Sequence, residues 1–134
     1  MLQRDYIQRL IREFTAALRR ILEKKETGER QQEMRRLFTV YMGDYEFFHT
    51  ATLDDIMRWA EKYPEEERLW RISMLAELYN AEADLLSEPM RTAQLGMAYM
   101  LFDFTDRHSG IYSPDRLRKM NRIKKMTSNN NGCK

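Results

Sequence analysis

Two histidines and a set of clustered carboxylates are the side chains best able to do chemistry in this sequence. Glu46 and His49 have the Glu-x-x-His spacing that places two metal ligands on one face of a helix. A di-iron bundle needs a second such pair and two more carboxylates, but the other histidine, His108, has Thr105 at the matching position. We therefore interpret the pair as incidental and expect no metal and no cofactor.

Nucleophilic catalysis has no candidate set either. His108 lies near the expected end of a helix, where a polar or cationic group interacts favourably with the negative end of the helix dipole. The two histidines are far apart in the chain, and the single cysteine, Cys133, is in the tail. No serine has a nucleophile-elbow context. We expect His108 to have a capping role.

Carboxylates are plentiful around the expected fourth and fifth helices. General acid and base catalysis would need several of them to converge. Acidic residues are seldom buried, so we expect solvated or ion-paired side chains instead, and we expect the protein not to be an enzyme. The four candidates are Glu82, Asp84, Asp103 and Asp106.

The densest basic cluster lies near the C-terminus, where counterion release would favour binding to phosphates. No aromatic residue follows Tyr112, although single-strand recognition usually uses stacking rings beside the charges. Nucleic-acid binding through the basic N- and C-terminal segments is therefore the alternative function. The cluster consists of Arg116, Arg118, Lys119, Arg122, Lys124 and Lys125.

Charge is distributed unevenly although the net charge is only +2. Residues 1–25 hold seven basic and three acidic residues, 26–113 hold nine and seventeen, and 114–134 hold seven and one. Basic ends around an acidic middle can pair within one molecule, link two molecules or attract a polyanion. The sequence leaves these three outcomes open.

The elements that must position these residues are expected to be helices. Apolar residues recur at three- and four-residue spacing, and only 5 glycines and 3 prolines occur among 134 residues. The pattern predicts an all-α fold of five main helices plus a short sixth, arranged as stacked antiparallel hairpins, tetratricopeptide-like or as an irregular bundle. The expected helices cover 3–25, 34–48 with a kink at Gly43, 53–63, 65–86, 90–110 and 114–123.

A single helical domain over residues 1–126 and a disordered tail over 127–134 are expected from the length and from the asparagine-rich end. The charged N-terminal residues do not fit a signal peptide. No apolar run approaches the roughly 18 residues of a membrane span. We expect a cytoplasmic protein that does not interact with membranes.

A shift of 38 residues superimposes part of the chain on itself. It places Leu37 and Tyr41 over Leu75 and Tyr79. Two-helix periods of about 34 to 47 residues are typical of tetratricopeptide-like arrays. Any two amphipathic helices also match at some offset, so a true repeat and a chance match both stay open.

Several segments resemble a family of small bacterial all-helical proteins of unknown function, best represented in gut anaerobes. The resemblance implies a cytoplasmic helical protein, tetratricopeptide-like in its later part, and it carries over no functional residue. The segments are Leu2-Gln3-Arg4-Asp5-Tyr6-Ile7 with Leu10-Ile11 and Phe14, Leu75-Ala76-Glu77-Leu78-Tyr79, Asp106-Arg107-His108-Ser109, Tyr112-Ser113 and Asp115-Arg116.

Two features suggest association with other proteins. Trp59 and Trp70 fall outside the apolar stripes of their helices, which makes them candidates for an exposed or intersubunit contact. The N-terminal helix has a narrow, heptad-like apolar stripe that suits a partner helix. We therefore expect a non-enzymatic interaction or scaffold protein with a protein partner or self-association, such as a homodimer. The biological process and the binding residues are not encoded in any feature above.

Overall fold

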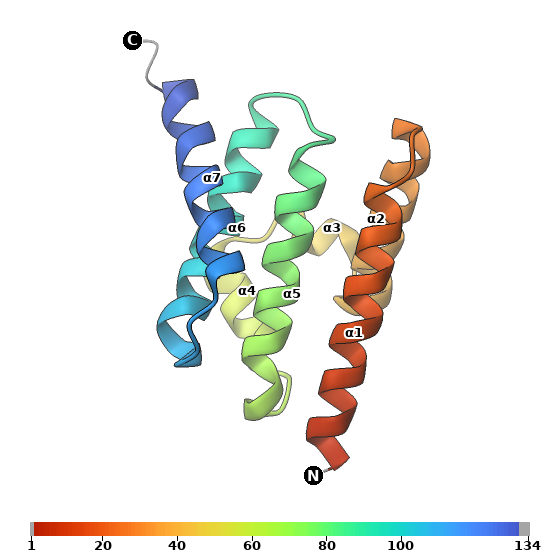
Figure 1. Cartoon of the computed structure of the whole chain (residues 1–134), viewed down its shortest axis with the longest axis vertical. Helices are drawn as coiled ribbons and strands as arrows, with labels where there is room; N and C mark the ends of the chain where they lie inside the picture. The colour runs from red at the N-terminus through yellow and green to blue at the C-terminus, as the bar shows by residue number, and fades with distance from the viewer. Residues whose placement is uncertain (1, 132–134) are drawn as a thin grey trace. The chain divides into compact units, whose positions relative to one another are not determined.

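The computed structural model describes residues 2–131, which form seven α-helices and no strand (Figure 1). The all-α prediction is confirmed. The helices are α1 (Leu2–Leu22), α2 (Thr27–Tyr41), α3 (Tyr45–Phe48), α4 (Leu53–Ala60), α5 (Glu65–Ala83), α6 (Met90–Ser109) and α7 (Pro114–Asn131).

Local capping chemistry explains several helix ends. Thr52 and Asp55 form a capping box, in which the Asp55 amide donates to Thr52 Oγ1 (3.2 Å) and the Thr52 amide donates to Asp55 Oδ2 (2.9 Å). The Ser113 hydroxyl oxygen accepts from the Arg116 amide (3.2 Å) at the start of α7. Gly110 ends α6 in the left-handed conformation, with φ of 68°.

The segment around Gly43 differs from the single kinked helix expected over 34–48. Helix α2 ends at Tyr41, and the separate one-turn helix α3 begins at Tyr45. Gly43 has φ of 139°, which a residue with a side chain rarely adopts, so the helix cannot continue through it. The Asp44 side chain then accepts from the Phe47 amide and caps α3. This break is one reason for seven helices instead of six.

Helix α7 is longer than the short C-terminal helix that the sequence predicts. It continues to Asn131, so residues 127–131 of the expected disordered tail are helical, and residues 132–134 lie outside the described residues. The Thr127 hydroxyl donates to the Ile123 carbonyl (3.0 Å), and Met126 and Thr127 are half-buried. These contacts extend the helix beyond its last large apolar core residue, Ile123.

The chain divides into two compact units at a point inside α5, between Met74 and Leu75. The single helical domain expected over residues 1–126 stays a prediction. Apolar periodicity shows which face of a helix is buried, but it does not show which helices share a core. Each unit is therefore described by itself.

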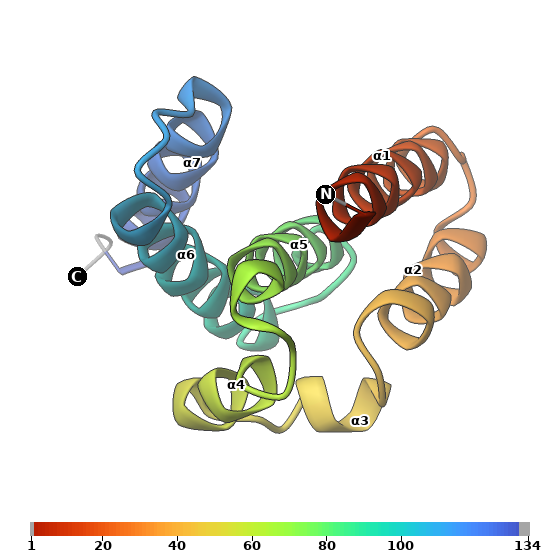
Figure 2. The ribbon, with the colours of Figure 1, turned by 90° about the horizontal axis from the view of Figure 1, so that it is seen from below.

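In the first unit, α1 packs against α2, and the chain passes through α3 and α4 to α5 (Figure 2). Ile7, Phe14 and Ile21 of the apolar stripe of α1 are buried inside the protein, whereas Leu10, Ile11 and Leu18 are half-buried and Leu22 is 52% exposed. Trp59 is also buried, with 8% exposure, and makes edge contacts with Phe48 and Tyr63. Other buried apolar residues are Met34, Leu37, Phe38, Met42, Ile56, Ala60, Ile72 and Met74.

The first unit also contains a buried ion pair between two residues at i and i+4 of α5. The Arg71 guanidinium donates twice to Glu67 Oε1 (2.7 and 2.9 Å) and once to the Tyr41 carbonyl (2.7 Å). It lies 4.4 Å from the centre of the Tyr63 ring. Arg71 therefore links α5 to the end of α2 and to the residues before α5.

In the second unit, α6 packs against α7. Gln94 of α6 donates to the Glu82 carboxylate (2.8 Å) and to the Tyr79 carbonyl (3.2 Å), which connects α6 to α5. The 38-residue repeat is not confirmed, because α4 has 8 residues where α6 has 20. Buried apolar residues are Leu75, Ala76, Leu78, Tyr79, Ala83, Leu95, Ala98, Leu101, Phe102, Met120 and Ile123. Within residues 2–131, none of the helices combines the length and the apolar character that crossing a membrane requires.

Candidate binding surface on helix α7

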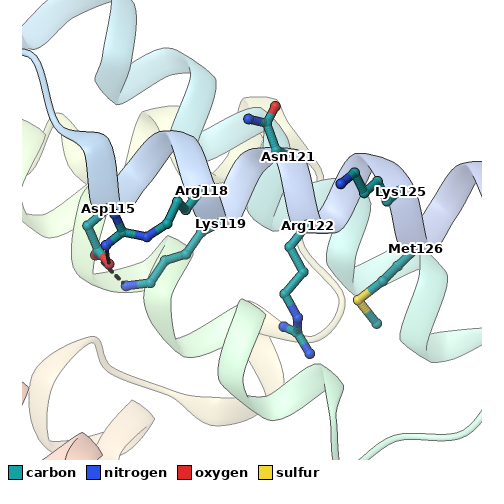
Figure 3. A pocket seen from close by; sticks show the side chains of 7 residues that line it. All are labelled: Asp115, Arg118, Lys119, Asn121, Arg122, Lys125 and Met126. Carbon is teal, nitrogen blue, oxygen red and sulfur yellow. Dashed lines mark hydrogen bonds and ion pairs between the residues drawn. The ribbon is translucent and has the colours of Figure 1, made fainter.

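Four residues of the basic cluster, Arg118, Lys119, Arg122 and Lys125, line an open hollow of about 680 Å³ beside α7 (Figure 3). Arg118, Arg122 and Lys125 follow at i, i+4 and i+7, so they share one face of the helix. We call the residues that line this hollow the α7 surface; they are Asp115, Arg118, Lys119, Asn121, Arg122, Lys125 and Met126.

Contacts on the opposite side of α7 hold this surface outward. Met120 and Ile123 are buried and anchor the helix in the core of the second unit. Arg116, whose side chain is only 12% exposed, donates to Asp106 Oδ1 (2.9 Å) and to the Ile111 carbonyl (2.7 Å). This residue of the predicted basic cluster therefore fastens α7 to α6 and is not part of the surface.

Lys119 joins α7 to α5 through two carboxylates. Its Nζ atom lies 2.8 Å from Glu77 Oε1 and 2.8 Å from Asp115 Oδ2. Burial raises the pKa of Glu77, and the attraction of Lys119 offsets only part of that effect. The hydrogen bond from Lys119 lowers the pKa of Asp115. Lys119 is thus a structural cation at the edge of the surface.

The remaining basic residues are more accessible to a ligand than Arg116 and Lys119 are. Arg118 lies 3.2 Å from Asp115, and Arg122 lies 3.7 Å from Asp84, but both arginine side chains are more than half exposed. Exposed pairs of this kind contribute about 0 to 1 kcal/mol, so a partner can replace them at small cost. Lys124 and Lys125 are exposed and have no carboxylate within ion-pair distance among the described residues.

The side chains of this surface offer both charged and apolar contacts. Its walls combine the aliphatic stems of long basic side chains with the Met126 thioether, and its rim carries guanidinium and ammonium groups. Guanidinium groups bind carboxylates through two parallel hydrogen bonds, and a thioether contacts aromatic rings favourably. The surface is suited to an acidic partner with an apolar or aromatic side chain.

The four carboxylates considered for acid and base catalysis do not converge. Glu82 is buried and accepts from Gln94, whereas Asp84 is half exposed near Arg122. Asp103 pairs with Arg107 on the same helix, and Asp106 pairs with Arg116 of α7. Each carboxylate therefore has its own partner, but the burial of Glu82 differs from the solvated or ion-paired side chains expected at all four positions.

The histidines are held by their own helices. His49 Nδ1 donates to the Tyr45 carbonyl (2.7 Å), and the Glu46 side chain is 72% exposed near Arg35. His108, in the last turn of α6, donates through Nδ1 to the Phe104 carbonyl (2.8 Å). No group of three or more candidate metal ligands occurs in the part of the chain that the structure describes.

Sequence reasoning identified the basic residues of this surface but missed its other members. Asn121 and Met126 were not considered, although Met126 follows Arg122 by one helical turn and so shares its face. Glu77 was missed as the partner of Lys119 because it lies 42 residues away in the chain. We interpret the surface from its own residues, since no protein-family model, curated protein or solved structure matches this chain.

Proposed function

We propose that this chain is a non-enzymatic helical interaction protein that binds a protein partner through the α7 surface. The observation that carries the proposal is the row of exposed cations Arg118, Arg122 and Lys125 next to Met126 along an open hollow. The α1–α2 and α6–α7 pairs support the stacked antiparallel hairpins expected of such a scaffold.

A protein partner fits this surface better than a nucleic acid. Aromatic side chains, on which single-stranded bases would stack, do not occur among the lining residues. Arg118, Lys119 and Arg122 already lie close to carboxylates in the folded chain, which shows that carboxylate groups can be accommodated there.

Site-specific photocrosslinking tests this proposal directly. A photoreactive amino acid replaces Asn121, which lines the hollow, in the full-length protein expressed in its native cell. We expect a discrete protein adduct whose yield falls when Arg118→Glu and Arg122→Glu are added. The control position is Gln32, an exposed polar residue on α2 in the first unit.

Two results would contradict the proposal. Adducts that are the same from positions 121 and 32 would indicate random collision, and the proposed interaction would be wrong. An adduct with nucleic acid, lost in the same charge variant and weakened by salt, would establish the alternative function instead.

A further inference from the structure

We infer that the partner of the α7 surface is a second copy of this chain, which binds through the exposed start of α5. This inference rests on the proposed function and names its partner. The acidic middle of the chain has an excess of eight carboxylates over basic residues, and the segment from residue 114 has an excess of six basic residues. The two surfaces therefore carry opposite charge.

The start of α5 presents unpaired carboxylates beside an exposed aromatic ring. Glu65 and Glu66 are exposed, and neither has an ion-pair or hydrogen-bond partner among the described residues. Trp70 follows Glu66 by one helical turn and is 43% exposed. Large exposed aromatic side chains beside charged groups are typical of protein interfaces. We call Glu65, Glu66 and Trp70 the α5 surface.

The two surfaces match in spacing as well as in charge. Glu66 and Trp70 are four residues apart on α5, and Arg122 and Met126 are four residues apart on α7. Positions i and i+4 lie about 6 Å apart along a helix face. Two helices lying side by side in the same direction can therefore place Glu66 against Arg122 while Trp70 packs on the Met126 thioether.

The other surface expected to support self-association is partly used inside the protein. In the heptad-like stripe of α1, Ile7, Phe14 and Ile21 are buried, with 5%, 2% and 3% exposure, and Leu10, Ile11 and Leu18 are half-buried. Of the two tryptophans, Trp59 is in the core, so Trp70 is the one that can meet a partner. The α5 surface thus combines the exposed tryptophan with unpaired acids.

Different surfaces meet in this contact, so the assembly is head to tail. Such contacts form rings when the rotation closes and open filaments when it does not. Each side contributes only about two helical turns, which is characteristic of small, transient interfaces. We therefore expect weak association that increases with protein concentration and decreases with salt, because screening shortens the range of charge interactions to about 3 Å at 1 M.

Sedimentation velocity of the purified full-length chain, over roughly a hundredfold range of concentration, tests the inference. The wild type should associate at low salt. Arg118→Glu, Arg122→Glu and Lys125→Glu together should weaken association about tenfold, as should Glu65→Lys with Glu66→Lys. Trp70→Ala should weaken it without changing the helicity measured by circular dichroism.

Mixing the two charge-reversed proteins provides the decisive measurement. Each alone should associate about tenfold more weakly than the wild type, but the mixture should regain association, because the reversed α7 of one is now complementary to the reversed α5 surface of the other. The matched control replaces three exposed arginines elsewhere, Arg9→Glu, Arg12→Glu and Arg36→Glu, and should still associate.

Three results would overturn the inference. They are a wild type that stays monomeric at the highest concentration, charge-reversed proteins that fail to restore association on mixing, and loss of association only in the control variant. The proposed function fails separately. If the adduct from position 121 contains a different protein, the inference is wrong but the proposed function stands, and if no specific adduct forms, both are wrong.

Discussion

Glu77 lies next to the α7 surface and contacts one of the residues that line it, Lys119. It is a partly buried carboxylate of α5 that binds Lys119 of α7, which is also bound by Asp115. Burial raises the pKa of Glu77 above its usual value, whereas the hydrogen bond to Lys119 lowers the pKa of Asp115. The two carboxylates that hold Lys119 should therefore titrate separately, with Glu77 first as the pH falls.

We predict that Glu77→Gln changes the pH dependence of stability. A carboxyl group whose pKa is higher in the folded chain than in the unfolded chain binds a proton more readily in the folded chain. Its contribution to the free energy of unfolding therefore increases as the pH falls through the folded pKa. This contribution becomes constant below the pKa of the unfolded chain, which is about 4.3 for glutamate. Urea denaturation between about pH 8 and pH 4 should show the wild type gaining stability relative to Glu77→Gln.

Over this pH range Lys119 keeps its charge, because Glu77 and Asp115 more than offset the effect of burial and raise its pKa. Glu26→Gln, which removes an exposed carboxyl group before α2, is the matched control for the loss of one charge. A stability difference between wild type and Glu77→Gln that is flat, or that falls with falling pH, would contradict the prediction.

For single residues, the sequence predicted which charged side chains matter better than it predicted which side chains they pair with. The cluster from Arg116 to Lys125 was recognised, and an ion-paired state was expected for carboxylates such as Asp106. The pairs Lys119 with Glu77 and Arg116 with Asp106 depend on which helices pack together, and a single sequence does not show this. The pair of Arg71 with Glu67 is different, because its i, i+4 spacing on α5 is visible in the sequence, and only its bond to the Tyr41 carbonyl depends on how helices pack.

Among the elements, the break between α2 and α3 depends on one glycine. We predict that Gly43→Ala costs about 1 to 3 kcal/mol of unfolding free energy, because φ of 139° is strained for any residue with a Cβ atom. Space is not the cause, since the nearest atom to an added Cβ, on the Phe48 ring, would lie at 3.6 Å. Chemical denaturation monitored by circular dichroism gives the value.

Gly28→Ala is the matched control for this substitution. Gly28 lies in the first turn of α2, has no positive φ, and an added Cβ atom would meet nothing within 4 Å. Alanine should therefore be neutral there or stabilise the helix by up to about 1 kcal/mol. Equal effects of the two substitutions would show that the conformation of Gly43 does not determine the break.

Helix starts were more predictable from the sequence than helix lengths. Thr52 with Asp55 and Ser113 with Pro114 act through local hydrogen bonds, so their signals lie within a few residues. Glycine is compatible with both a bend and an end of a helix, so the sequence predicts a kink at Gly43 where the structure has a break. The end of α7 was placed too early, since the helical contacts of Thr127 were not apparent from an asparagine-rich segment.

For the whole molecule, the division within α5 bears on whether the two units unfold together or separately. The boundary between Met74 and Leu75 falls inside one continuous helix of 19 residues. Starting a helix is costly and extending it is not, so a helix that loses the packing of one half tends to lose stability in the other. Helix α5 should therefore couple the unfolding of the two units.

We predict that the wild type unfolds in one transition and that Ser73→Pro separates it into two. Tryptophan fluorescence reports only on the first unit, because both Trp59 and Trp70 lie before Met74, whereas circular dichroism reports on all helices. The two denaturation curves should coincide in the wild type and in the matched control Ser73→Ala. Proline removes a helical hydrogen bond next to the boundary and costs about 3 kcal/mol of helix stability, so the two curves should diverge in Ser73→Pro.

If Ser73→Pro does not fold, Ser73→Gly provides a milder change, which costs about 1 kcal/mol at the same position. Coincident curves in a folded variant would show that α5 is not what couples the two units.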